Sequence, residues 1–450
     1  MTAWGSNMKT KTLFQIFSVL LLAVFLSVCS QPQSDNIETG EIPVIPEIPE
    51  TPETPETPET KIPTPSVIMG NKELSVSWSA EESVEYEIWY GTDNNSDKTI
   101  KWNGTITKSP PIAETVITNL ENGIAYYIWI KTKVNGVLSD FSIGVSGTPE
   151  LPPTVIYDNF VYVSGGTVTG SDKYTLSVTV PIEPTGYMNA GKTLSKKGVF
   201  VEGRTVSFNS FFIAKYETTR QLWYEVQTWA ESNGYNFQNK ISIPNETNKN
   251  KPITNINWRD AIVWCNAYSE KSGLEPIYYY SSISNENILR DSRNENGTAC
   301  DNAVMDSGKN GFRLPTEIER EYTARGGNPG KADWMFLYAG SNNAEEVAWH
   351  HGNSVYQIQD IGQKNPNRLG VFDMSGNVQE WGWDWMNYNI AITADTPIDG
   401  EAYSSRLNQK PMEGGGVGSN ITLSCVADRW GYGTNYKDNY VGFRLVQSIK

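Results

Sequence analysis

Cysteine and histidine are scarce in this chain of 450 residues, which contains four cysteines and two histidines. Thiolates are nucleophiles and soft metal ligands, so the positions of the cysteines limit the chemistry that is open to the protein. Cys425 is the one thiol in residues 414–444, a segment rich in glycine, serine, asparagine and aromatic side chains. One thiol can act as a nucleophile, but it cannot form a bis-thiolate metal site by itself.

The other thiols and both imidazoles have simpler interpretations. Cys265 falls on the apolar stripe of an expected helix, where it acts as a small buried hydrophobe. Three cysteines remain after Cys29, namely Cys265, Cys300 and Cys425. Because three is an odd number, either one thiol stays free or no disulfide forms. His350 and His351 are adjacent, so their side chains point apart and we expect no shared metal and no acid–base pair.

The first 29 residues have the pattern of a bacterial lipoprotein signal. Two lysines precede an apolar run over residues 13–28, which is shorter than the ~20 residues of a membrane-spanning helix. The run ends in Leu-Ser-Val-Cys at Cys29, which resembles a lipobox, although Val28 replaces the preferred small residue. We predict a signal peptide over residues 1–29 and acylation of Cys29. Ordinary signal cleavage nearby is the alternative.

A proline-rich spacer follows over residues 30–63. Its prolines recur with a period of three, at Pro43, Pro46, Pro49, Pro52, Pro55 and Pro58. Polyproline II has three residues per turn, so this segment predicts an extended stalk.

The composition of the whole chain is that of a globular protein. Charged residues make up 19% of the sequence, and 15 tryptophans and 23 tyrosines supply material for a large core. The formal net charge of −15 does not suit nucleic acid or an anionic membrane surface, because both require clustered lysine and arginine. We therefore expect no nucleic-acid partner.

Residues 64–150 show the period-two alternation of a half-buried sheet. Alternate positions from Leu74 to Trp78 are apolar, and an Asn-Gly pair further on marks a hairpin turn. The run from Leu120 to Tyr126 resembles the fibronectin type III signature, in which the tyrosine makes a hydrogen bond at a corner. We predict a β-sandwich of this type that acts as a spacer.

Three helices are expected after residue 155, and each has a recognisable N-terminal cap. The caps are Thr218 or Thr219 for the first helix, Asn257 for the second, and Thr316 with Glu319 in capping-box spacing for the third. The second of these helices carries the apolar stripe that includes Cys265.

Three ordered motif blocks occur in the same segment. They are Gly311-Phe-Arg-Leu-Pro-Thr-Glu317 with Tyr322-Thr-Ala-Arg-Gly-Gly327, then Gly370-Val-Phe-Asp-Met-Ser-Gly-Asn-Val-Gln-Glu-Trp381, then Val441-Gly-Phe-Arg444. With these blocks, residues 155–450 resemble the formylglycine-generating enzyme (sulfatase-modifying factor) family. The resemblance implies an irregular α+β domain related to C-type lectins. The predicted fold is therefore multidomain, a β-sandwich followed by this irregular α+β domain.

The resemblance implies a structural calcium ion at the second block. By position, its ligands would be the Asp373 carboxylate and the carbonyls of Met374, Gly376 and Val378. Hard oxygen donors of this kind suit calcium. The alternative is a turn in which Asp373 accepts backbone N–H bonds.

The family oxidase uses two cysteines five positions apart to bind Cu(I) and to engage a substrate thiol. By position these cysteines would fall at Ser419 and Ser424, next to Cys425. Serine hydroxyls are hard donors that do not replace thiolates, so we expect no copper site. Cys425 would be catalytic only if the protein is an enzyme, and its simpler interpretation is a buried cysteine in a strand.

Residues 430–440 mix aromatic and small polar side chains, as antibody loops do. In lectin-like relatives the equivalent region presents the binding surface. We predict that a glycan or a protein binds there, in contact with Trp430, Tyr432, Asn435, Tyr436 and Tyr440. The alternative is an irregular tyrosine-rich loop without a ligand.

Together these features predict an exported lipoprotein, anchored through Cys29 in the bacterial cell envelope or at the cell surface. Its formylglycine-enzyme-like domain would act as a binding head for an extracellular or periplasmic ligand. One alternative is a formylglycine-generating oxidase that acts on sulfatases. A second alternative is a structural envelope protein whose head binds no ligand.

Overall fold

The computed structural model of the chain describes residues 61–109, 111–153, 157–182, 189–386, 391–396 and 409–449. The predicted signal peptide, Cys29 and all but the last three residues of the predicted stalk lie outside these ranges. Within them, no helix is both long and apolar enough to span a membrane.

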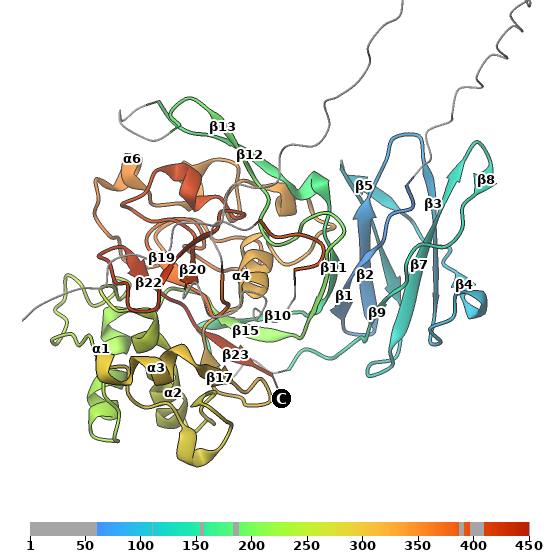
Figure 1. Cartoon of the computed structure of the whole chain (residues 1–450). Helices are drawn as coiled ribbons and strands as arrows, with labels where there is room; N and C mark the ends of the chain where they lie inside the picture. The colour runs from blue at the N-terminus through green and yellow to red at the C-terminus, as the bar shows by residue number, and fades with distance from the viewer. Residues whose placement is uncertain are drawn as a thin grey trace, which may run out of the picture. The chain divides into compact units, whose positions relative to one another are not determined.

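Two antiparallel sheets enclose one apolar core in the first part of the described chain (Figure 1). The first sheet contains β1 (Ser66–Gly70), β2 (Glu73–Ser79), β5 (Thr107–Ser109) and β6 (Ile112–Thr118). The second contains β3 (Glu85–Gly91), β4 (Ile100–Lys101), β7 (Tyr126–Val134), β8 (Val137–Leu138) and β9 (Val145–Gly147). The corner hydrogen bond predicted for Tyr126 is present, because the Glu121 amide donates to its Oη atom at 3.1 Å. Membership of the fibronectin type III class stays a prediction.

The first sheet continues beyond residue 150 into the C-terminal segment. β11 (Gly166–Thr169) pairs antiparallel with β1, with Thr167 opposite Val67, and β14 (Thr205–Phe208) pairs with β11. The strand order is β14-β11-β1-β2-β6-β5. Two strands from the second predicted domain therefore complete a sheet of the first.

Short strands from distant parts of the sequence build the sheets of the C-terminal segment. One four-stranded sheet has the order β10 (Phe160–Val163), β15 (Phe211–Ala214), β23 (Val446–Ser448) and β18 (Phe312–Arg313). The other has the order β21 (Trp430–Gly433), β20 (Gln409–Glu413), β19 (Gln379–Trp381) and β22 (Val441–Gly442). Two further antiparallel pairs are β12 (Leu176–Thr179) with β13 (Thr193–Lys196), and β16 (Tyr278–Tyr280) with β17 (Ala303–Met305).

The three predicted helices are confirmed, and each begins at an N-cap residue close to it in sequence. The helices are α1 (Arg220–Glu231), α2 (Trp258–Lys271) and α4 (Glu317–Ala324), together with the shorter α3 (Gly297–Asp301), α5 (Ala344–Val347) and α6 (His351–Ser354). Thr219 caps α1, and Asn257 and Thr316 make capping boxes at α2 and α4. Each cap satisfies backbone N–H groups that have no partner within the helix.

Tryptophan dominates the core on which these helices pack. In Figure 1, α1, α2 and α3 lie together, and α2 contacts α1, α3 and β18. Trp223 of α1 stacks on Trp264 of α2 with ring centroids 5.5 Å apart and planes at 6°. Cys265 is fully buried in the same core, as predicted for a small apolar residue.

Candidate functional site

Cys425 is a buried thiol. It follows the 3₁₀ helix at Ile421–Ser424 and so does not lie in a strand, which corrects the sequence prediction. Its side chain is 1% exposed and packs among apolar residues that include Met374 and Val426. This burial raises the pKa of the Cys425 thiol to about 11. At neutral pH the thiol is therefore protonated, whereas the thiolate is the form that attacks substrates and binds metals.

The two positions predicted from the oxidase carry serines in different surroundings. Ser419 is half-buried, and its carbonyl accepts a hydrogen bond from the His351 amide at 3.1 Å. Ser424 is buried, and its Oγ atom has no hydrogen-bond partner within the described ranges. A Cβ atom on Gly415 would lie 2.5 Å from that oxygen, so the backbone passes close to it. The two serines therefore differ in burial, and neither supplies a thiolate.

Cys265 and Cys300 are also buried and free, but they belong to a different apolar core from that of Cys425. Among the residues that the structure describes, no three histidine, cysteine, aspartate or glutamate side chains form a group that could hold a metal ion. His350 caps α6 with its Nδ1 atom, whereas the ring of His351 lies against Tyr356. The two imidazoles thus make separate contacts.

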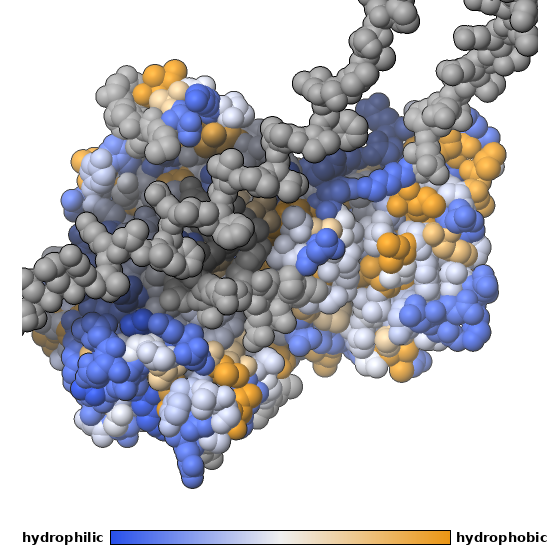
Figure 2. Space-filling view, in the orientation of Figure 1, coloured by the Kyte–Doolittle hydropathy of each residue, from blue (hydrophilic) through white to orange (hydrophobic). Residues whose placement is uncertain are grey.

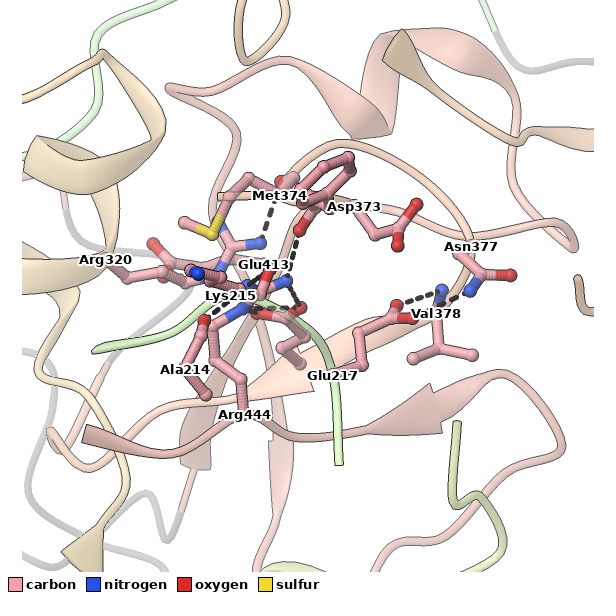
Figure 3. A network of polar contacts seen from close by, with 12 residues as sticks. Ala214, Lys215, Glu217, Arg320, Asp373, Met374, Asn377, Val378, Glu413 and Arg444 are labelled. Carbon is pink, nitrogen blue, oxygen red and sulfur yellow. Dashed lines mark hydrogen bonds and ion pairs between the residues drawn. The ribbon is translucent and has the colours of Figure 1, made fainter. Parts of the chain in front are cut away.

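The predicted calcium loop is held by protein groups at each of its residues (Figure 3). The Asp373 Oδ2 atom accepts a hydrogen bond from the Gly362 amide at 2.7 Å, and burial raises the pKa of Asp373 to about 6. The Met374 carbonyl accepts from Arg320 Nη2 at 3.0 Å. A guanidinium at this carbonyl disfavours a calcium ion there, because two cations would share one oxygen. Calcium stays a prediction for this loop.

Backbone amides of the same loop also donate hydrogen bonds to protein groups. The Gly376 amide donates to the Gly414 carbonyl at 2.7 Å. The Val378 amide donates to Glu217 Oε1 at 3.1 Å, and the Asn377 side chain donates to Glu217 Oε2 at 2.7 Å. Glu217 therefore anchors the loop from the segment that precedes α1.

A buried ionic network centred on Glu380 is joined to this loop, and Figure 3 labels its two arginines, Arg320 and Arg444. Arg444 donates to Glu380 from Nε and Nη2 at 2.5–2.9 Å, and both side chains are 0% exposed. Arg444 also donates to the carbonyls of Ala214 and Phe372 at 3.2 and 2.9 Å. Arg320 approaches Glu380 Oε2 at 3.3 Å. The network ties β15, β19 and the Asp373 loop to the C-terminal strands.

Sequence reasoning did not predict the roles of Glu217, Arg320, Glu380 and Arg444. Burial, together with Asp373 and Glu380 nearby, raises the pKa of Glu217. A signal was present, because Arg320, Glu380 and Arg444 are charged residues of the three motif segments, which pack into one domain. Buried charges require partners, so these three residues could have been paired with one another.

The predicted binding residues lie at one end of the β20–β21 ladder and just beyond it. Trp430 and Tyr432 belong to β21, and Tyr432 stacks on Tyr436 with ring centroids 4.0 Å apart and planes at 13°. These three aromatic side chains are half-buried against the core, whereas Asn435 is exposed. Burial also raises the pKa of Tyr436 to about 12. The aromatic surface is thus smaller than composition alone suggested.

Tyr440 lies near Ser419 and not in the Tyr432–Tyr436 stack. Its carbonyl accepts from the Gln379 amide at 2.8 Å. A Cβ atom on Gly418 would lie 2.5 Å from the Tyr440 ring, so the ring covers that glycine. The structure therefore divides the predicted binding residues between two neighbouring places.

A buried lysine, Lys410, lies in β20 next to β21. Lys410 is opposite Tyr432 in the β20–β21 register. Its Nζ atom lies over the rings of Trp258, Trp383 and Trp385, at 4.1, 4.7 and 3.5 Å from their centroids. Burial lowers the pKa of Lys410 well below its usual range. Cation–π contacts of this kind stabilise an ammonium that has lost its water.

The chain belongs to the family with the sulfatase-modifying factor enzyme 1-like domain, which matches residues 151–449. This confirms the family resemblance. The chaperone protein LppX of Paenibacillus barcinonensis is 35% identical over 202 residues, which cover 41% of this chain and 66% of that protein. The formylglycine-generating enzyme of Mus musculus is 28% identical over 96 residues, or 18% of this chain and 24% of the enzyme. The chain thus spans less than two thirds of either relative.

Two solved structures match a similar share of the chain. The crystal structure of CarF is 23% identical, with a TM-score of 0.47, and covers 66% of this chain and 100% of its own. Treponema denticola variable protein 1 is 25% identical, with a TM-score of 0.45, and covers 66% of this chain and 99% of its own.

Proposed function

We propose that the C-terminal domain is a ligand-binding head and does not act as a formylglycine-generating oxidase. The observation that carries this proposal is the state of the three positions where thiol chemistry would occur. Positions 419 and 424 are serines, and burial raises the pKa of the Cys425 thiol to about 11. Copper(I) requires soft thiolate ligands, and a protonated, enclosed thiol cannot supply them.

We propose that the ligand is a polypeptide, and a glycan is the alternative. Half-buried tyrosines beside small polar residues are typical of protein-binding surfaces, because the aromatic rings supply contact area at low entropic cost. A second support is the relative from Paenibacillus barcinonensis, which is named a chaperone protein. A chaperone recognises other polypeptides, so a protein ligand agrees with that relationship.

The location of the head is a further part of the proposal. Acylation of Cys29 and the proline-rich stalk would present the head in the cell envelope, at a distance from the membrane. Cys29 lies outside the described residues. A Cys29→Ala protein that still partitions with membranes after export would contradict the lipid anchor.

The ligand is tested with a permanently unfolded polypeptide, such as labelled reduced and carboxymethylated α-lactalbumin, by fluorescence anisotropy. We expect saturable binding that weakens about tenfold in Trp430→Ala and in Tyr436→Ala, which corresponds to about 1.4 kcal/mol. Tyr280→Ala is the matched control, because Tyr280 is an aromatic residue of the same domain that is 39% exposed. Saturable binding of peptidoglycan fragments in place of the polypeptide would establish the glycan alternative, and binding of neither would favour a structural role.

The oxidase alternative has its own test. Purified protein is incubated with Cu(I), oxygen and a cysteine-containing sulfatase peptide, and the peptide mass is measured. Conversion of the cysteine to formylglycine would refute the proposed function, and an unchanged peptide mass is the result we expect.

A further inference from the structure

Val355 and Tyr356 form an exposed apolar tip with an unfavourable backbone. Both residues follow α6, and their φ angles are +51° and +60°. The Val355 side chain is 75% exposed and that of Tyr356 is 50% exposed. In this left-handed conformation Cβ approaches a carbonyl oxygen, and a β-branched residue such as valine is the least suited to it.

Burial does not compensate for this strain, because neither side chain enters the core. The surrounding hydrogen bonds impose the conformation. Ser354 Oγ donates to the His350 carbonyl at 2.6 Å, and the Gln357 amide donates to the Ser354 carbonyl at 2.9 Å. Strain that a fold maintains at an exposed position is a pointer to a function at that position.

Other exposed aliphatic residues of the same domain lack this feature. Ile243 is 72% exposed but does not have a positive φ angle. On the face shown in Figure 2, apolar side chains form small patches among hydrophilic ones, as is normal for protein surfaces. An exposed apolar side chain alone therefore does not indicate a function, whereas exposure together with backbone strain does.

The tip is connected to the proposed binding residues by direct contacts. The Tyr356 ring lies 4.1 Å from the His351 ring, centroid to centroid. The His351 amide donates to the Ser419 carbonyl, and the adjacent Gly418 lies under the ring of Tyr440. A continuous strip thus leads from Tyr356 to Tyr440.

We propose that Val355 and Tyr356 are the apolar anchor of the head for its polypeptide ligand, a role that rests on the proposed function. A projecting aliphatic side chain offers no hydrogen bond to a sugar, but it buries well against the aliphatic and aromatic side chains of a non-native polypeptide. The favoured ligand is therefore a segment of unfolded protein with exposed apolar residues.

The test uses Val355→Asn and Tyr356→Asn in the intact protein, because asparagine tolerates the left-handed conformation and removes the apolar contact. We expect each variant to raise the melting temperature by about 1–3 °C. We also expect each to weaken binding of carboxymethylated α-lactalbumin about tenfold. Ile243→Asn is the matched control, with neither effect.

The outcomes separate this inference from the proposed function. If wild type binds the unfolded polypeptide and Trp430→Ala weakens that binding, whereas Val355→Asn and Tyr356→Asn do not, the anchor is refuted and the proposed function stands. If wild type does not bind the polypeptide, both are refuted. A lower melting temperature in Val355→Asn would show that the tip is not strained and would also overturn the inference.

Discussion

The network around Glu380 and the strip from Val355 to Tyr440 belong to one domain but differ in the burial and charge of their side chains. In the network, Arg444 and Glu380 are fully buried and joined by several hydrogen bonds. In the strip, the side chains are largely exposed or half-buried and two backbone positions are strained. The difference shows that charge inside this domain positions the loops, whereas the groups available to a ligand lie on the loops themselves.

The largest expected effect comes from breaking the network. Arg444→Met leaves Glu380 buried without its main partner, so we expect a loss of about 3–5 kcal/mol in the free energy of unfolding. Urea denaturation followed by tryptophan fluorescence measures it. Arg293→Met is the control, because its partner Asp291 lies in a more exposed ion pair. A loss below about 1 kcal/mol for Arg444→Met would mean that the network does not hold the domain together.

The second effect is a loss of stability caused by a substitution in β1, the strand that packs in the cores of both segments. In β1, Val67 packs in the core of the two N-terminal sheets, whereas Ile68 packs in a core of the C-terminal segment. Ile68→Ala is therefore expected to destabilise the C-terminal segment, by about 2–4 kcal/mol, and to lower one common transition in calorimetry. Val116→Ala, at a position 37% exposed on β6, is the control. Two separate transitions in wild type would contradict the shared sheet.

Asp384 gives a pH-dependent effect of intermediate size. Burial, with Glu317 nearby, raises the pKa of Asp384 to about 7. A carboxyl group whose pKa is higher in the folded than in the unfolded protein stabilises the fold when it is protonated. This contribution is complete below the unfolded pKa of about 3.9 and is lost as the pH rises through about 7. Asp384→Asn removes this loss, so its stability relative to wild type should rise by about 1–3 kcal/mol from pH 5 to pH 8. A pH-independent difference between the two proteins would show that Asp384 is ionised throughout.

The smallest expected effect tests calcium at the Asp373 loop. If an ion binds there, EGTA should lower the melting temperature by about 1–4 °C, because a bound ligand stabilises the folded state. Magnesium should not restore it, because magnesium demands a stricter octahedral geometry. An unchanged melting temperature would leave Asp373 as a turn residue that accepts the Gly362 amide.

Local features of the fold could be predicted from the sequence, and distant pairings could not. Thr219, Asn257 and Thr316 begin helices because a cap needs only its next three residues. The parallel pairing of β19 with β22 joins residues that are far apart in the chain. No periodicity within either strand specifies that partner.

The candidate site was predictable only in part, for the same reason. The second motif block located Asp373, and counting from the glycines after Glu413 gave positions 419 and 424. Neither revealed that Arg320 occupies the Met374 carbonyl or that Val355 takes a left-handed conformation. Both facts depend on how separate segments pack against one another.

The most direct test of the central claim is the alkylation of Cys425 in the native protein. Iodoacetamide is added at pH 8, and the Cys425 peptide is quantified by mass spectrometry over time. The burial of the thiol and its raised pKa predict modification no faster than the rate at which the protein unfolds. Rapid modification, at the rate of an exposed thiol of ordinary pKa, would contradict a non-catalytic head.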